Sequence, residues 1–106
     1  ALGDVATGCL QFSLIARGTD PSNWPDHMDT ARTKQFLRGY RPQTPWSQPE
    51  LQILVGLIIE ALITEAVTPI AATGKFAYVQ GFRFLKMVAR KVKWLQQNAL
   101  QALSSV

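Results

Sequence analysis

The side chains that could do chemistry are few, and their spacing matches no catalytic or metal-binding pattern. His27 is the only histidine, and it lies between Asp26 and Asp29 with no cysteine near it. Metal sites built on histidine usually add further histidine or cysteine ligands, so His27 alone does not predict one. A Ser-His-Asp arrangement would need a nucleophile motif such as G-x-S-x-G, which the sequence lacks.

The remaining reactive groups point the same way. Glu60 and Glu65 lie in the most apolar stretch, where burial would raise their pKa, but a spacing of five places them on different helix faces. Residues 73–75 match only a fragment of a phosphate-binding loop. Cys9 is the only cysteine, so we expect a small buried hydrophobe and no intramolecular disulfide. The sequence predicts a protein that is not an enzyme and has no cofactor or metal.

Charge is divided unevenly along the chain, although the net charge is only +4. Residues 1–65 hold all seven acids and five bases, whereas residues 66–106 hold six bases and no acid. A basic segment suits an acidic macromolecule, which can be a nucleic acid, an anionic membrane surface or an acidic protein face. The alternative is a solvated face that only keeps the protein soluble.

The bases of the C-terminal segment fall on one side of a predicted helix and are bordered by an aromatic side chain. Phosphate binding requires positive side chains along an exposed face, with an aromatic ring available for stacking. This pattern favours nucleic acid as the partner. The predicted partner-binding residues are Arg83, Lys86, Arg90, Lys91, Lys93, Trp94, Arg38 and Arg41.

The element expected to hold this face in place is a long apolar helix over residues 48–68. Ser47 and Glu50 form a capping box at its start, and Pro49 lies in the first turn, where its missing N–H costs nothing. Pro69 is expected to end the helix. A helix that is apolar on nearly every side is either a central core helix or a membrane span.

The fold predicted from these patterns is all-α, a single domain over residues 1–106. Amphipathic segments lie before and after the apolar helix, and the motif at residues 23–26 repeats its start signal, with a capping residue, any residue, proline and an acid. The domain would contain about four helices, roughly over residues 4–17, 24–38, 48–68 and 74–103, with the others packed around the central one at 48–68.

The last helix is expected to begin at the cap Thr73 and to bury one apolar stripe. This stripe comprises Tyr78, Phe82, Leu85, Val88, Ala89, Val92, Leu95, Ala99 and Leu103. A short connection makes the last two helices antiparallel neighbours. That arrangement would bring Glu60 within reach of Arg83 or Lys86, so Glu60 is predicted to be a structural ion-pair partner.

Two alternatives follow from the apolar helix. Residues 51–71 could form a span or an inserted helix of a membrane-associated small protein, or of an accessory subunit of a membrane complex. Each of Glu60 and Glu65 would then cost about 2.5 kcal/mol or more at the bilayer centre. In the second alternative the chain is an assembly subunit that forms a homo- or hetero-oligomer through residues 51–67.

Overall fold

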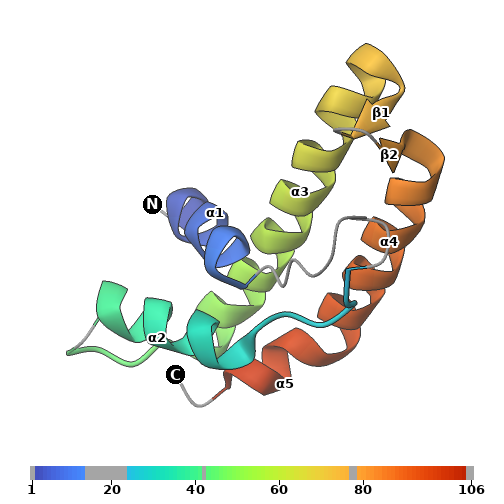
Figure 1. Cartoon of the computed structure of the whole chain (residues 1–106). Helices are drawn as coiled ribbons and strands as arrows, with labels where there is room; N and C mark the ends of the chain where they lie inside the picture. Colours follow the sequence, from blue (N-terminus) through green and yellow to red (C-terminus); the bar gives the residue numbers. More distant parts are fainter. Residues whose placement is uncertain (1, 14–23, 42, 77–78, 105–106) are drawn as a thin grey trace.

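The computed structural model describes residues 2–13, 24–41, 43–76 and 79–104, and it confirms an all-α bundle (Figure 1). One long helix, α3, crosses the molecule, with α1 and α2 on one flank and α4 and α5 on the other. The elements are α1 (Leu2–Ser13), α2 (Thr30–Tyr40), α3 (Gln48–Thr73), β1 (Lys75–Phe76), β2 (Val79–Gln80), α4 (Gly81–Trp94), the π-helical turn η2 (Leu95–Ala99) and α5 (Leu100–Leu103).

The predicted start of α3 is confirmed. The Ser47 hydroxyl accepts from the Glu50 backbone N–H at 3.2 Å, and the Glu50 carboxylate accepts from the Ser47 backbone N–H at 3.1 Å. Both halves of the capping box are therefore present, and Pro49 lies in the first turn. The backbone N–H groups of Ser47 and Glu50 thus have hydrogen-bond partners, and Pro49 has no N–H that needs one.

The predicted end of α3 at Pro69 is wrong, because the helix continues for one more turn to Thr73. Proline removes a single backbone donor, and the Thr73 hydroxyl donates to the Pro69 carbonyl at 2.9 Å. The chain leaves the helix at Gly74, whose φ of 77° lies in the left-handed region that favours glycine. The backbone N–H of Gly74 donates to the Ile70 carbonyl at 2.7 Å and closes the last turn.

The start of the last helix moves from the predicted residue 74 to Gly81. A short antiparallel pairing of Lys75 with Gln80 and of Phe76 with Val79 precedes it. The ring of Phe76 stacks on Phe84 with centroids 3.9 Å apart, which holds this hairpin against α4. Thr73 is accordingly the last residue of α3 and not the cap of the next helix. The predicted end near Leu103 is confirmed.

Helix α2 also begins later than predicted. Its cap is Asp29, whose side chain accepts from the Arg32 backbone N–H at 3.1 Å, and not a residue near 23. The segment before it is drawn into packing, since Met28 is buried and the Trp24 ring meets the Phe84 ring edge-on at 6.4 Å. The expected cap Asn23 and residues 14–17 of the first predicted helix lie outside the described residues.

The buried face of α4 is the largest correction to the predicted packing. Phe84, Met87 and Val88 are buried, although burial was predicted only for Val88. Phe82, which was predicted to be buried, is 66% exposed. The predicted face is correct further along, where Leu95, Ala99 and Leu103 are buried. The first half of α4 therefore carries two apolar stripes, and the core covers the one that the 3.6-residue period did not single out.

Candidate interaction surfaces

The predicted partner-binding residues do not form one surface. Arg83, Lys86 and Lys93 are exposed along α4, and the Lys86 ammonium lies over the Phe82 ring at 4.6 Å. Arg38 is exposed in the last turn of α2, at the opposite end of the molecule from the start of α4 (Figure 1). Arg38 and Arg41 therefore do not extend the basic face of α4 as predicted.

Lys91 is not a surface residue, which corrects the prediction. It is 2% exposed, and its ammonium donates to the His27 backbone carbonyl at 3.1 Å. Burial lowers the pKa of Lys91, and the negative charge of Asp26 opposes that shift. On α4 it lies one turn beyond Met87, on the stripe that faces the segment over residues 24–28. Spacing alone could not separate it from the exposed bases on either side.

Two further bases are engaged within the chain. Arg90 forms an ion pair with Asp26, with the guanidinium Nε 3.0 Å from the carboxylate. Arg41 binds Glu50 through both terminal nitrogens, at 2.6 and 2.9 Å, and its guanidinium lies 4.2 Å from the centre of the Trp46 ring. Trp94 is half-buried, with its ring 6.3 Å from that of His27.

The contacts of Glu50 make the start of α3 sensitive to acid. Hydrogen bonds from Ser47, first from its backbone and then from its hydroxyl, lower the pKa of Glu50, and Arg41 adds to the effect. Because the folded-state pKa is below the unfolded value, the carboxylate stabilises the fold above the unfolded pKa. That stabilisation is lost as the pH falls through the lowered value.

We expect Glu50→Gln to lower the urea midpoint at neutral pH and to lower it less at acid pH, because the wild-type carboxylate becomes protonated as the pH falls through its lowered pKa. Circular dichroism during urea titration at the two pH values measures this. The control is Glu65→Gln, because Glu65 is exposed on the same helix. An equal loss of stability at both pH values would contradict the role given to the carboxylate.

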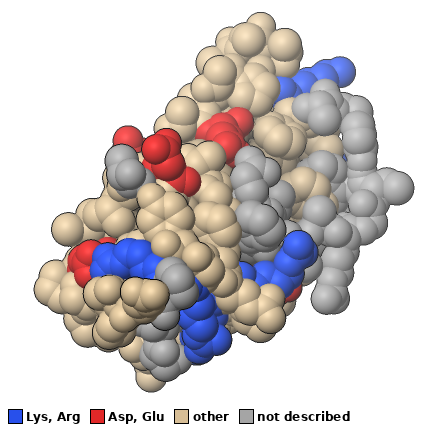
Figure 2. Space-filling view, turned by 90° about the vertical axis from the view of Figure 1, so that its left-hand side faces the viewer, with Lys and Arg blue, Asp and Glu red and all other residues tan. Residues whose placement is uncertain are grey.

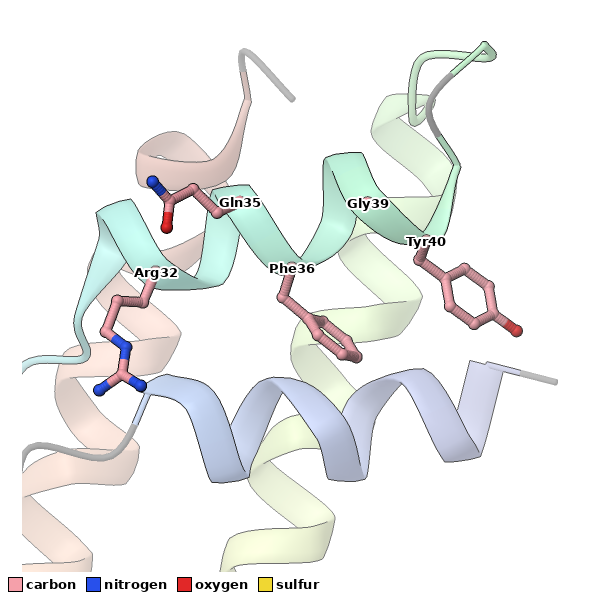
Figure 3. Close-up of a pocket in the computed structure, with 5 residues that line it drawn as sticks. All are labelled: Arg32, Gln35, Phe36, Gly39 and Tyr40. Atoms are coloured by element: carbon pink, nitrogen blue, oxygen red, sulfur yellow. The ribbon is translucent and has the colours of Figure 1, made fainter.

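The residues with catalytic potential are not brought together. Burial raises the pKa of the Cys9 thiol to about 12, so it is an inert core residue as expected. Among the described residues no three His, Cys, Asp or Glu side chains could share a metal ion. An open hollow on α2 is lined by Arg32, Gln35, Phe36, Gly39 and Tyr40, and Figure 3 shows the Phe36 ring pointing from α2 toward α1. It offers an apolar wall and no acid–base pair.

Glu60 does not pair with the basic helix, which corrects a second prediction. It is exposed, and it lines a groove between α1 and α3 with Gly3, Thr7, Leu57 and Thr64. No described cation lies within ion-pair distance of it. Its side chain lies on the groove side of α3, whereas Leu62 and Ala66 are the α3 residues that face α4. In the upper half of Figure 2, acidic side chains lie apart from the Lys and Arg side chains.

The α3–α4 pair is covered on one side. A small apolar cavity there is lined by Leu62 and Ala66 of α3 and by Phe84 and Met87 of α4, and Leu10 of α1 and Trp24 close it. Helix α1 and the segment over residues 24–28 therefore both pack on this side. On the opposite side of the α3–α4 pair, side chains of both helices remain accessible to solvent.

That opposite flank carries two apolar stripes, which we call the open face. On each helix the spacing is three or four residues, so each set forms one line. Their side chains are exposed or half-buried, with Ile63 at 42%, Val67 at 45% and Phe82 at 66% exposure. The open face comprises Ile59, Ile63, Val67 and Ile70 of α3 and Phe82, Leu85, Ala89 and Val92 of α4.

The sequence did contain a signal for this surface. Helix α3 is the one helix in the described part of the chain that is long and apolar enough to cross a membrane by length and composition. Only 28% of its most apolar 18-residue stretch is buried. The sequence shows that α3 is apolar on nearly every side, but the prediction placed this helix at the centre of the bundle and so did not identify its exposed side.

Comparison of the chain with protein-family models, with curated proteins and with solved structures found no match.

Proposed function

We propose that the protein is a non-enzymatic helical interaction subunit that packs through its open face against an apolar surface of a protein partner. The observation that carries this proposal is the exposure of Ile63, Val67 and Phe82 on adjoining helices. Contiguous apolar patches of this kind on soluble proteins mark interaction sites.

The charge of α4 favours a protein partner over a bilayer. With α4 packed beside it, α3 could cross a membrane only by carrying Arg90, Lys91 and Lys93 with it, since they lie level with its middle. Each of these bases costs about 2.5–3.5 kcal/mol at the bilayer centre. A membrane-spanning α3 would therefore require the α3–α4 contact to open. Association with a membrane complex through a neighbouring subunit needs no such rearrangement.

The test is sedimentation of the purified chain with and without mild detergent, combined with binding of an apolar fluorescent dye. We expect the wild-type chain to self-associate, to need detergent, or to bind the dye. The double variant Ile63→Gln/Val67→Gln should be a soluble monomer with reduced dye binding, and Tyr40→Gln, exposed on α2, should behave as wild type. A wild-type monomer that binds neither dye nor detergent would refute the proposal.

Nucleic-acid binding is the second candidate, supported by the exposure of Arg83, Lys86 and Lys93 along α4. If it is correct, a labelled single-stranded oligonucleotide should bind, and its affinity should fall steeply as salt is raised. The variant Lys86→Glu/Lys93→Glu should abolish binding, whereas Arg38→Glu should not. Binding that is insensitive to salt and to the double variant would exclude this role for α4.

A further inference from the structure

The open face has unlike charges on its two edges. On the α3 edge, Glu60 is exposed beside the apolar stripe, and no base lies anywhere in α3. On the α4 edge, Lys86 and Lys93 are exposed beyond Phe82 and Ala89, and no acid lies in α4. An apolar centre with one acidic and one basic edge is complementary to its own copy when the two edges are exchanged.

The heights of these charges along the helices can be compared. Ile70 lies beside Gly81, since a Cβ on Gly81 would be 2.7 Å from the Ile70 methyl Cγ2. Because α3 and α4 run antiparallel with the same rise per residue, each step back along α3 matches a step forward along α4. Glu60 is therefore level with Lys91 and within a turn of Lys93, while Val67 is level with Phe84 and within a turn of Phe82.

From this arrangement we infer that the open face is covered by the open face of a second copy, in a symmetric dimer whose two-fold axis runs along the helices. This inference rests on the proposed function and identifies the protein partner as a second copy of the chain. A two-fold axis along the helices lays α3 of each copy on α4 of the other at the same height, so that four helices surround one apolar seam. Val67 then meets Phe82 of the second copy, and Glu60 meets Lys93 of the second copy.

Other occupants fit the two edges less well. A two-fold axis perpendicular to the helices and in the plane of the open face would lay α3 on α3 and α4 on α4, so that each edge meets an edge of like charge, which is strongly unfavourable. An anionic lipid surface would attract Lys86 and Lys93 but would repel Glu60. Of these three arrangements, only the exchanged one pairs both edges with unlike charge.

The experiment is sedimentation equilibrium of the full chain without detergent, for wild type and charge variants. We expect a wild-type dimer, and a dissociation constant raised about tenfold or more in Glu60→Lys and in Lys93→Glu, since each places like charges at two symmetric positions. A mixture of the two variants should restore the dimer, because both contacts then join unlike charges. The single-chain double variant Glu60→Lys/Lys93→Glu should also dimerise, but not with the wild type.

Two controls separate a change in association from a change in the stability of the single chain. Glu60 and Lys93 are exposed in the single chain, so circular dichroism melts at monomeric concentrations should match wild type, and Arg38→Glu should leave the dimer unchanged. A wild-type monomer at all concentrations, or a dimer in which the mixture shows no rescue, overturns the inference. If the chain is then still bound by the apolar dye in a manner that depends on Ile63 and Val67, the proposed function survives with a different partner.

Discussion

Replacement of Leu54 by alanine is expected to lower the free energy of unfolding by about 2–5 kcal/mol. Leu54 is fully buried in the N-terminal third of α3, the helix that α1, α4 and α5 all contact. Truncation removes buried methyl groups and leaves a cavity that several elements would have to close together. The neighbouring Ile53 is 55% exposed, so Ile53→Ala should cost less than about 1 kcal/mol.

Urea unfolding followed by circular dichroism measures both values under the same conditions. The pair isolates burial, because the two residues are adjacent, aliphatic and in the same helix. Equal losses of unfolding free energy in the two variants would contradict the packing described for α3. They would indicate that the helix is surrounded by protein on the Ile53 side as well.

The second large effect is expected where α4 begins. A Cβ on Gly81 would lie 2.7 Å from the Ile70 side chain and 2.8 Å from the backbone oxygen of Gly74. That same oxygen accepts from the Gly81 backbone N–H at 2.9 Å, so it cannot move away without a loss at the base of the hairpin. Gly81→Ala should therefore lower the free energy of unfolding by about 1–3 kcal/mol, although alanine is the better helix former.

Gly56 is the matched control, because a Cβ there would meet no atom within 4 Å. Gly56→Ala should raise the free energy of unfolding by about 0.5–1 kcal/mol, since only the helical propensity changes. Opposite signs for two glycine-to-alanine changes are the expected result in thermal and urea unfolding. Stabilisation by both changes would contradict the close approach of α3 and α4 at the hairpin.

Proximity of α3 and α4 at this hairpin also fixes the axial heights on which the dimer depends. Gly81 sets Ile70 beside the first turn of α4, and the positions of Glu60 and Lys93 follow from it. A variant that disturbs the hairpin should therefore weaken self-association as well as the monomer. Gly81→Ala and Glu60→Lys differ in this respect, because the second is expected to change association alone.

The sequence by itself determined the features that depend on neighbouring residues. The capping box of Ser47 and Glu50 specifies where α3 begins, because a cap is a contact between residues three apart. The spacing of apolar residues indicated helices and an all-α fold. The burial of Cys9 was expected from its residue type. The basic C-terminal segment was also read directly from the sequence, since the distribution of charge along the chain does not depend on the fold.

Only the tertiary structure decided which of several equivalent faces is covered. Helix α4 carries Phe84, Met87 and Val88 on one stripe and Phe82 and Leu85 on the other, and a period of 3.6 residues fits both. Packing by the distant segment over residues 24–28 selects the first stripe, and it buries Lys91 as it does so. The rotation of α3 within the bundle likewise directs Leu62 and Ala66 toward α4 and leaves Glu60 in the groove beside α1. Local sequence patterns indicate which secondary structure and which burial each residue favours. Contacts between residues far apart in the chain decide which apolar face is buried and which stays exposed.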